Sequence, residues 1–600
     1  LALMPTGGGK SITFQVPAMQ MEGICLVVTP LIALMKDQVE NLKARRIKAA
    51  AIFSGMTQEE IIVTLDNCLY GGYKFLYVSP ERLSTELFLS RLKLMNVSLI
   101  AVDESHCISQ WGYDFRPSYL RIAEIREHLP TVPLLALTAT ATPEVVKDIQ
   151  LKLHFPQENV FQKSFERKNV AYVVREVEDK NYLLLTILKK VAGASIVYVR
   201  NRKKTKEIAD FLNENNIAAA HYHAGLTNQQ KDLRQDNWKK NETRVIVATN
   251  AFGMGIDKPD VRSVIHLDLP DSLEAYFQEA GRAGRDEKKA FAILIYNKSD
   301  STKLKKRLSD NFPDKKYIRT VYEKLAHYFQ VAVGSGEGIV YPFNLIDFCK
   351  KFKLSILPTY NSLKILELAG YLELTDELDN PSRILFTIKR DELYFFQTNN
   401  AQLDQLIQLL LRSYTGLFTE YAHINEDVLA QRLKQTRETI YQQLLSLNRL
   451  GIVHYIPAKK TPFIIYTCNR IDTDKIQLNK VIYDERKERY EKRTEQLLSY
   501  ATQNSVCRSQ FLLRYFGQTN VPPCQQCDVC LKKKEQEIRQ EEFNAIATSI
   551  KAQLSIKPMT LWELITHTKK KEDNLLAVIR YMTDNKLILY NSENKFELKT

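Results

Sequence analysis

The sequence predicts an α/β protein in which two parallel-sheet domains stand in tandem and smaller α+β segments follow them. The first observation is an alternation of short apolar, β-branched runs with amphipathic helical stretches, which begins near residue 1 and restarts near residue 195. Alternation of this kind is typical of a parallel sheet with helices on both faces. The second observation is length, because 600 residues are more than one hydrophobic core can use.

The composition is that of a folded, basic protein. Hydrophobic residues make up 44% of the chain and charged residues 26%, which excludes a largely disordered, collagen-like or simple coiled-coil protein. The 84 Lys and Arg against 70 Asp and Glu leave a formal charge of +14; this favours a polyanionic partner such as nucleic acid, with a merely basic protein as the alternative. Nine cysteines are too few for a disulfide scaffold, and we find neither a signal peptide nor a transmembrane run. We therefore expect a cytoplasmic protein that makes no membrane contact.

The first domain, residues 1–165, begins with a short apolar strand that runs directly into a glycine loop. Because residue 1 is Leu and nothing precedes this strand, we expect the chain to lack its natural N-terminus. A helix is predicted at Leu31–Ala44, and strands at Ile24–Thr29, Phe75–Ser79, Leu99–Val102 and Leu134–Leu137. The junction lies near residues 163–182. The second domain, residues 166–300, repeats the pattern with strands at Ser195–Val199, Arg244–Ala248, Val264–Leu267 and Ala290–Tyr296.

Three later segments share one local pattern of two helices, a Gly or Asn at the end of the second helix, and two strands. The pattern is typical of a winged helix, with ordinary α+β structure as the alternative. In each segment we expect the two strands to pair with each other as a wing. The segments are residues 301–395 (helices Leu345–Phe352 and Thr359–Ala369, strands Tyr371–Thr375 and Arg383–Ile388), residues 396–480 (helices Glu426–Leu433 and Arg437–Leu450, strands Ile452–Ile456 and Phe463–Thr467) and residues 535–600 (helices Thr560–His567 and Glu572–Thr583, strands Leu587–Tyr590 and Phe596–Leu598).

The loop between the first strand and the first helix has the composition of a phosphate-binding loop. Three successive glycines let backbone N–H groups approach phosphates, and the helix that begins at Lys10 adds its positive dipole end. Lys10 can reach the β and γ phosphates, and the Ser11 hydroxyl can hold Mg²⁺. The first glycine of the usual pattern is replaced by Met4, so a glycine turn with a fortuitous Gly-Lys-Ser is the alternative. The candidate nucleotide contacts are Thr6, Gly7, Gly8, Gly9, Lys10 and Ser11.

An acidic pair, Asp103 and Glu104, follows the predicted strand Leu99–Val102. If this strand lies beside the strand of the phosphate loop, Asp103 is placed to hold the Mg²⁺ of a nucleotide and Glu104 to orient or deprotonate the attacking water. His106 would sense the γ-phosphate or couple it to nearby loops. An acidic helix cap is the alternative for the pair alone.

Two arginines close the second domain. We expect Arg282 and Arg285 on one face of a Gly/Ala-rich helix, from which an arginine could stabilise the charge of phosphoryl transfer. Two surface arginines are the alternative. The glycines of the preceding loop, residues 249–257, permit close backbone packing.

Taken together, these motifs resemble those of the superfamily 2 helicases, and three further stretches resemble the RecQ family. The stretches are Val28–Gln38, Ser79–Leu83 and the aromatic-rich run Ile108–Pro117. The resemblance is dense over residues 1–297, clear over 484–531 and weak elsewhere. It implies two tandem RecA-like helicase domains that use ATP and Mg²⁺ to unwind DNA, with 3′-to-5′ polarity, in DNA repair or recombination. A translocase that does not unwind, an RNA helicase and a non-catalytic DNA-binding scaffold remain the alternatives.

The resemblance also groups residues by partner. Trp111, Phe115 and Arg116 offer stacking and cation–π surfaces to unpaired bases, and aromatic packing between domains is the alternative. Further nucleotide contacts are expected at Gly255, Asp257 and Gln278. The expected DNA contacts are Thr29, Pro30, Ser109, Gln110, Trp111, Phe115, Arg116 and Thr249.

Four cysteines form the last motif. Cys507, Cys524, Cys527 and Cys530 have the spacing of a four-thiolate site, within a zinc-binding domain expected at residues 481–534 and led by a charged helix at Asp484–Tyr500. The resemblance favours structural Zn²⁺; an iron–sulfur cluster or a redox dithiol is the alternative.

The sequence departs from the family at several points. Ser105 replaces the usual Ala, the element normally upstream of the phosphate loop is absent, and two winged-helix-like segments precede the zinc-binding domain. The segment 535–600 would bind duplex DNA, with a wing near Asn591–Lys595 as strand separator. The expected partners are single-stranded and forked duplex DNA; no residue identifies a protein partner such as a single-strand binding protein.

Overall fold

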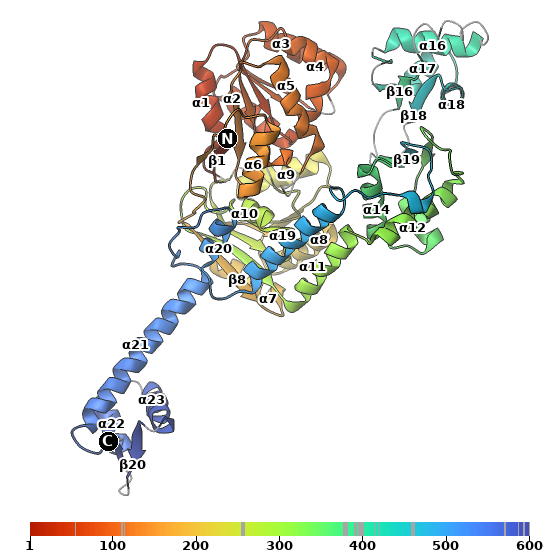
Figure 1. Cartoon of the computed structure of the whole chain (residues 1–600). Helices are drawn as coiled ribbons and strands as arrows, with labels where there is room; N and C mark the ends of the chain where they lie inside the picture. The colour runs from red at the N-terminus through yellow and green to blue at the C-terminus, as the bar shows by residue number, and fades with distance from the viewer. Residues whose placement is uncertain are drawn as a thin grey trace. The chain divides into compact units, whose positions relative to one another are not determined.

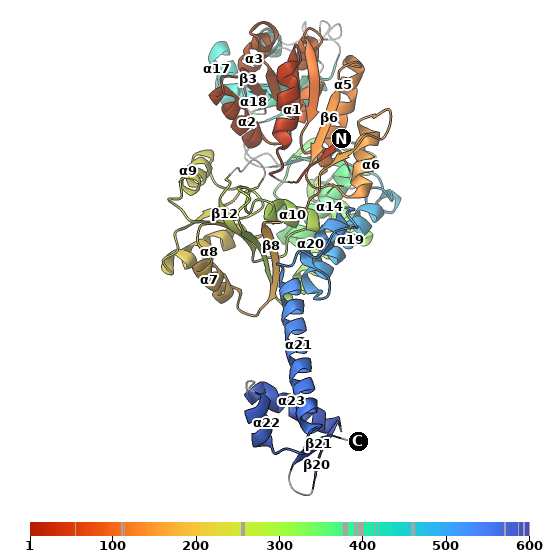
Figure 2. The same ribbon diagram turned by 90° about the vertical axis from the view of Figure 1, so that its left-hand side faces the viewer.

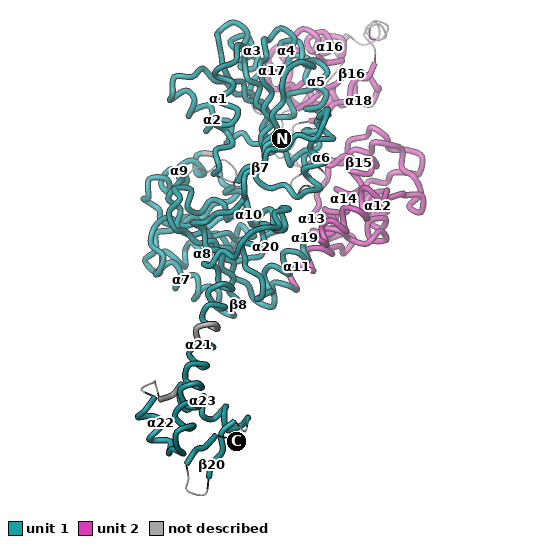
Figure 3. The backbone as a smooth tube through the Cα atoms, turned by 60° about the vertical axis from the view of Figure 1, so that its left-hand side comes forward, with its two compact units in different colours: residues 1–301, 493–600 teal, residues 302–492 magenta. Residues whose placement is uncertain are grey.

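A computed structural model (Figure 1) gives the architecture of the chain. It describes residues 1–5, 7–53, 56–109, 112, 115–253, 258–375, 382–388, 393, 401–414, 416–418, 421–457, 462–568, 572–585, 587–591 and 595–598. The chain divides into two compact units, residues 1–301 with 493–600 and residues 302–492 (Figure 3). Over the described residues, no helix combines the length and apolar character needed to cross a membrane.

The first unit opens with a seven-stranded sheet in the order β3-β4-β2-β5-β6-β1-β7, in which all pairs are parallel. The predicted strands are all present. The strands are β1 Ala2–Leu3, β2 Ile24–Val28, β3 Ala49–Ile52, β4 Phe75–Val78, β5 Val97–Val102, β6 Leu134–Thr138 and β7 Phe161–Gln162. The helices are α1 Lys10–Gln20, α2 Ile32–Ala44, α3 Gln58–Tyr70, α4 Glu86–Leu92, α5 Ile122–His128 and α6 Pro143–Lys152.

The strand order corrects one expectation. The acidic pair was expected on the strand beside that of the phosphate loop, but β6 lies between β5 and β1. The parallel pairing still brings the carboxyl ends of β1 and β5 to the same edge of the sheet, because parallel strands point the same way. The loops that follow these strands therefore meet although the strands do not touch.

A second, six-stranded parallel sheet has the order β10-β11-β9-β12-β13-β8. Its strands are β8 Val170–Glu176, β9 Ala194–Tyr198, β10 Ala219–Tyr222, β11 Val245–Ala248, β12 Val261–His266 and β13 Ala290–Tyr296. Its helices are α7 Lys180–Lys190, α8 Arg202–Glu214, α9 Asn228–Lys239 and α10 Leu273–Ala280. The chain passes from one sheet to the other between residues 162 and 170, inside the predicted junction. Two RecA-like parallel-sheet domains in tandem are thus confirmed.

The remainder of the first unit contains the cysteine cluster and the C-terminal segment. Its helices are α19 Asp484–Thr502, which begins in the second unit, α20 Arg508–Tyr515, α21 Asp528–Leu554, α22 Leu561–Thr568 and α23 Glu572–Asp584. Strands β20 Ile588–Tyr590 and β21 Phe596–Leu598 form the expected antiparallel hairpin. Ile546, Ile550 and Leu554 of α21 join the core of α22 and α23, so this winged-helix-like segment begins within α21 (Figure 2).

The second unit is entered through α11 Lys298–Asn311 and contains all the helices predicted for the two middle segments. Its other helices are α12 Lys315–Phe329, α13 Leu345–Phe352, α14 Ile356–Leu368, α16 Ala401–Ser413, α17 Glu426–Leu433 and α18 Arg437–Arg449. Its strands are β14 Val340–Pro342, β15 Leu372–Thr375, β16 Arg383–Phe386, β17 Ala422–His423, β18 Val453–Ile456 and β19 Phe463–Tyr466.

The pairing of these strands contradicts the expected wings. β15 pairs with β19 instead of β16, and β18 pairs with β16 instead of β19. The sheets are therefore β14-β19-β15 and β17-β16-β18, and each contains one strand from the other predicted segment. The boundary predicted after residue 395 is not followed, because the domain made by residues 382–457 is inserted between the two wing strands of an outer winged helix.

The hydrophobic cores follow the same division. One core takes its residues from the outer winged helix on both sides of the insertion, such as Tyr322, Leu374 and Tyr466. A separate core takes its residues from the insertion alone, from Ile384 to Tyr455. Apart from a small cluster in which Ile456 of the insertion packs with Phe463 and Ile465 of β19, each domain buries its own apolar side chains, which is the requirement for independent folding.

We expect the insertion to be removable. Joining Thr375 to Phe463 by a short turn should leave the outer winged helix folded, because these residues already pair and the outer core loses no member. The deletion is made in a chain that is otherwise complete, and the protection of the α12 and α14 amides from hydrogen exchange is measured. Deleting residues 396–480 is the matched control: it removes β19 and should abolish that protection, since β19 is the central strand of the outer sheet. Equal protection in the two deletions would contradict the nested arrangement.

Candidate active site

A cavity of about 660 Å³ in the first unit is lined by residues that follow strands of both parallel sheets. Nine of the predicted nucleotide residues line it together, namely Gly7, Gly9, Lys10, Ser11, Asp103, Glu104, Gln278, Arg282 and Arg285. Thr6, Gly255 and Asp257 lie outside the described residues. The structure thus brings most of the predicted nucleotide residues together in one cavity.

The phosphate loop depends on its glycines. Gly7 and Gly9 have φ of 79° and 86°, a region that L side chains rarely adopt. A methyl group on Gly8 would lie 2.8 Å from the Pro5 carbonyl oxygen. Gly9 is the residue before α1, and no side chain caps that helix, so its first N–H groups are available to phosphate oxygens.

Lys10 and the acidic pair form a buried ionic cluster. Lys10 Nζ lies 3.1 Å from Glu104 Oε1, and the Glu104 backbone N–H donates to Asp103 Oδ1 at 2.9 Å. His106 Nδ1 lies 3.4 Å from Glu104 Oε2 and 2.9 Å from Thr138 Oγ1, so His106 links Glu104 to the end of β6. Glu104 itself has φ of 48°, a strained value for a residue with a side chain.

Burial and charge set the pKa values of this cluster in different directions. Burial raises the pKa of Asp103 to about 6, with a contribution from Glu104 and opposition from Lys10. Burial would also raise the pKa of Glu104, but the charges of Lys10 and His106 outweigh it and lower that pKa below its ordinary value. Glu104 is therefore the stronger partner of Lys10, and Asp103 is the weaker acid of the two.

The raised pKa of Asp103 predicts an effect of pH on stability. An acid whose pKa is higher in the folded state destabilises the fold once it ionises, so the cost is absent below about pH 4 and complete above the folded pKa of about 6. Asp103→Asn should therefore raise the free energy of unfolding by about 3 kcal/mol at pH 8 and by much less at pH 4. Thermal unfolding at the two pH values measures this. Asp286→Asn should act in the opposite direction at pH 8, because hydrogen bonding and charge lower the pKa of Asp286 despite desolvation; equal melting of the wild type and Asp103→Asn at pH 8 would contradict the prediction.

Ser11 has a partner that the sequence analysis did not assign. Gln38 of α2 donates through Nε2 to Ser11 Oγ at 3.0 Å, and its Oε1 accepts from Gln15 Nε2 at 3.0 Å. Gln15 also donates to the Tyr77 hydroxyl. Gln38 therefore orients the predicted Mg²⁺ ligand. Because Gln38 is the last residue of the RecQ-like stretch Val28–Gln38, the sequence could have singled it out as a candidate site residue.

The two arginines reach the cavity from a turn. The helix predicted for them is wrong: α10 ends at Ala280, and Gly284 adopts a φ of 55° that ends helical geometry. Arg282 is 4% exposed and contributes to the lowered pKa of Glu104 after Lys10 and His106. A methyl group on Gly7 would lie 3.3 Å from Arg285 Cγ, so this arginine passes directly over the phosphate loop.

The structure brings only some of the predicted DNA-contact residues close together. Arg116 Nη1 donates to the Pro30 carbonyl at 3.2 Å, which ties the aromatic-rich loop to the end of β2. Ser109 instead donates to Asp148 Oδ2 at 2.6 Å. Thr29 and Thr249 follow β2 and β11, one in each sheet, and Phe115 is partly buried. Gln110 and Trp111 lie outside the described residues.

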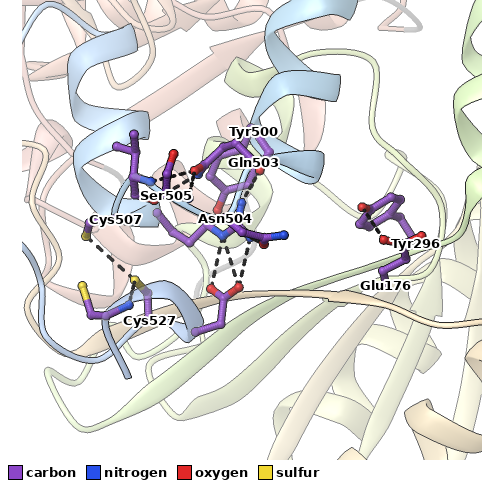
Figure 4. Close-up of polar contacts among 12 residues, drawn as sticks. Glu176, Tyr296, Tyr500, Gln503, Asn504, Ser505, Cys507 and Cys527 are labelled. Atoms are coloured by element: carbon purple, nitrogen blue, oxygen red, sulfur yellow. Dashed lines mark hydrogen bonds and ion pairs between the residues drawn. The ribbon is translucent and has the colours of Figure 1, made fainter. Parts of the chain in front are cut away.

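The four cysteines converge as a metal centre requires. Their Sγ atoms all lie within 4.8 Å of one another, and Cys507 Sγ faces Cys527 Sγ at 3.9 Å (Figure 4). Tetrahedral zinc with Zn–S bonds of about 2.3 Å separates its sulfurs by roughly 3.8 Å. The Cys524 and Cys530 amides donate to the Cys507 and Cys527 sulfurs, and thiol hydrogen bonds from Cys524 and Cys527 lower the pKa of Cys507. The donor set fits a structural Zn²⁺.

A buried ion pair holds this centre against the helix before it. The Arg508 guanidinium donates to both Asp528 carboxylate oxygens and to the Asn504 side chain. Arg508, at the start of α20, is 1% exposed and also donates to the Tyr500 carbonyl, so it joins α19, α20 and α21.

Comparison with known proteins agrees with this geometry. Four family models match: DEAD/DEAH box helicase (residues 1–149), helicase conserved C-terminal domain (179–287), RecQ helicase winged-helix domain, Bacteroidota (384–457), and RecQ zinc-binding (472–531). The winged-helix match coincides with the inserted domain, from β16 to β18, and not with either predicted middle segment.

Three relatives share the helicase region. The chain is 44% identical over 300 residues to the ATP-dependent DNA helicase RecQ of Bacillus subtilis, which covers 50% of this chain and 51% of that protein. It is 42% identical to the RecQ of Pasteurella multocida (51% and 49%) and 43% identical to the probable ATP-dependent DNA helicase RecS of Bacillus subtilis (49% and 60%). The chain thus spans about half the length of the relatives it matches. The chain thus contains both helicase domains together with winged-helix and zinc-binding modules of the RecQ type, and over about half of its length it is similar to RecQ helicases.

Proposed function

We propose that this protein is an ATP-dependent DNA helicase that couples ATP hydrolysis between its two parallel-sheet domains to the unwinding of duplex DNA. The observation that carries the proposal is the single cavity lined by Lys10, Asp103 and Glu104 from one sheet domain and by Arg282 and Arg285 from the other. A phosphoryl-transfer site needs this set: a cation and a metal ligand at the phosphates, a carboxylate for the water, and an arginine for the transferring group.

The ionic cluster supplies a switch for the first step. When phosphates enter, Lys10 exchanges its Glu104 partner for phosphate oxygens. Because the charge of Lys10 is the largest influence that lowers the pKa of Glu104, this exchange makes Glu104 more basic. Glu104 then accepts a proton or hydrogen bond from the attacking water only after the nucleotide is bound.

The remaining residues hold charge in place. Asp103 and Ser11 would hold Mg²⁺, which neutralises phosphate charge and orients the nucleotide. Gln38 keeps the Ser11 hydroxyl directed at that site. Arg282 and Arg285 stabilise the charge that develops on the transferring phosphoryl group.

The DNA substrate rests on the basic charge, the aromatic-rich loop and the names of the relatives. The +14 charge favours a polyanion, and the aromatic-rich run Ile108–Pro117 begins four residues after Glu104, where bound DNA could act on the ATPase. We further propose 3′-to-5′ polarity and a role in DNA repair or recombination. The C-terminal winged-helix segment would bind the duplex of a fork.

ATP hydrolysis by the full chain, measured with no nucleic acid, with single-stranded DNA and with single-stranded RNA, tests the proposal. We expect strong stimulation by DNA and little by RNA. Stimulation by RNA alone would favour an RNA helicase, and no stimulation would favour a binding scaffold. A strand-separation assay on forked duplexes with 3′ or 5′ tails then distinguishes unwinding from translocation alone.

The wing of the C-terminal segment is tested separately. β20 and β21 pair as a hairpin, and the Asn591 amide donates to the Lys595 carbonyl where it turns. Deleting residues 592–594 should leave DNA-stimulated ATP hydrolysis intact and reduce unwinding. Normal unwinding by this variant would refute the wing as strand separator.

A further inference from the structure

The turn that carries the two arginines is held from outside by another residue. α10 ends at Ala280, and the last carbonyls of a helix have no partner within it. In this turn the carbonyls of Gly281, Ala283 and Gly284 all accept from the guanidinium of Arg167, at 3.1, 2.9 and 2.9 Å. These three residues flank Arg282 on both sides and immediately precede Arg285.

Asn169 completes the clamp. Its side-chain amide donates to the Gly284 carbonyl at 2.7 Å and to the Lys288 carbonyl at 2.9 Å. The guanidinium of Arg167 also places a positive charge at the C-terminal end of α10, where the helix dipole favours it. The path of the turn thus depends on a side chain 114 residues earlier in the chain.

Arg167 and Asn169 lie on the segment that joins the two sheets, between β7 and β8. Residues of the zinc-binding module hydrogen-bond to the same segment and pack against it. Gln526, which lies between two of the cysteines, donates to the Lys168 and Val170 carbonyls, and Gln518 accepts from the Phe165 amide. The Phe165 ring also contacts Phe516, with ring centroids 5.7 Å apart.

We propose that Arg167 is a positioning residue for the arginine turn, and that it links the segment between the two sheets to the transition-state arginines. The proposal rests on the proposed function, since Arg167 acts only through Arg282 and Arg285. A shift of about 1 Å in a catalytic group can cost on the order of a hundredfold in rate. Loss of the clamp should therefore affect turnover and leave nucleotide binding at the phosphate loop unchanged.

The kinetic test compares the wild type with Arg167→Ala, Arg167→Lys and the neighbouring Lys168→Ala. Arg167→Ala should lower the DNA-stimulated kcat at least tenfold with KM for ATP within twofold. Arg167→Lys, which can still donate to one carbonyl, should recover part of kcat. Lys168→Ala should behave as wild type, because it removes a charge from the same segment without touching the clamp. An unchanged kcat in Arg167→Ala, or parallel losses of kcat and nucleotide affinity, would overturn the proposal.

A double-mutant cycle identifies the path of the effect. Single-turnover hydrolysis with excess enzyme measures the slow variants. In a background that lacks both arginines (Arg282→Ala with Arg285→Ala, treated as one change), the further change Arg167→Ala should cost less than twofold, because the residues it positions are already absent. A full additional loss in that background would mean that Arg167 acts elsewhere.

Hydrogen exchange gives a readout that does not depend on activity. The Gly284 amide donates to the Val261 carbonyl and the Asp286 amide to the Pro259 carbonyl, so both should be protected in the wild type. Arg167→Ala should accelerate exchange of residues 281–287 at least tenfold, while β12 and α10 stay protected and the zinc content stays at wild-type level. Unchanged exchange would overturn the inference even if the protein hydrolysed no ATP, whereas inactive wild type with accelerated exchange in the variant would count against the proposed function alone.

Discussion

Replacing Lys10 with alanine is expected to reduce DNA-stimulated ATP hydrolysis by at least a thousandfold. Lys10 is the cation at the start of α1, and it lies within 3.1 Å of the carboxylate proposed to orient the water. Its removal costs several kcal/mol of phosphate stabilisation and breaks the ion pair that Lys10 makes with Glu104. Steady-state phosphate release with saturating single-stranded DNA measures the effect.

Two companion variants make this result specific. Lys43→Ala removes an exposed lysine of α2 in the same sheet domain. Lys43 is not among the residues that line the cavity, so this variant should retain wild-type turnover. Glu104→Gln should also lose turnover but keep nucleotide affinity, because it retains Lys10 for the phosphates. Hydrolysis by Lys10→Ala within tenfold of wild type would show that the cavity is not the hydrolytic site.

The second large effect is expected at the cysteine cluster. Cys527→Ser should lose bound zinc and unfold the module, because structural zinc contributes on the order of 10 kcal/mol to such small folds. Cys527 is fully buried, it also caps α21, and its backbone neighbour Gln526 holds the segment between the two sheets. The loss should therefore extend to the exchange protection of residues 164–170.

Metal analysis and hydrogen exchange check this result. We expect one zinc per chain in the wild type and in Cys468→Ser, a half-buried cysteine outside the cluster. Cys527→Ser should contain less than a tenth of that amount. Full zinc content in Cys527→Ser, or iron with a visible absorption band in the wild type, would contradict a four-thiolate zinc centre.

Much of the fold could be predicted because its signals are local. The β-branched runs that became β2, β4, β9 and β11 are entirely buried, so each is apolar along its whole length and is easily recognised. The nucleotide residues follow such strands directly. Once the strands are placed, parallel topology alone brings their loops to one edge.

The missed features depend on distant partners. β16 and β19 are both short apolar strands at the same position in one repeated pattern, so nothing in either strand says which sheet it joins. The arginine turn was predicted as a Gly/Ala-rich helix, because nothing local to the turn shows that its carbonyls accept hydrogen bonds from the distant side chains of Arg167 and Asn169. Gln38 was visible in the RecQ-like stretch, but its hydrogen bond to Ser11 required the position of α2 beside α1.

The nested strand pairing also dictates an order of events during synthesis. The inserted domain is complete once residue 456 has been made, because β18 ends there and its partner β16 has been made earlier. The outer winged helix must wait for β19, so α12 to β15 emerge from the ribosome with their sheet lacking its central strand. Closing that sheet across the whole insertion is a long-range step, and such steps are slow. The later domain therefore folds first, and for that interval the earlier one presents unpaired β15 to any chaperone or neighbouring chain.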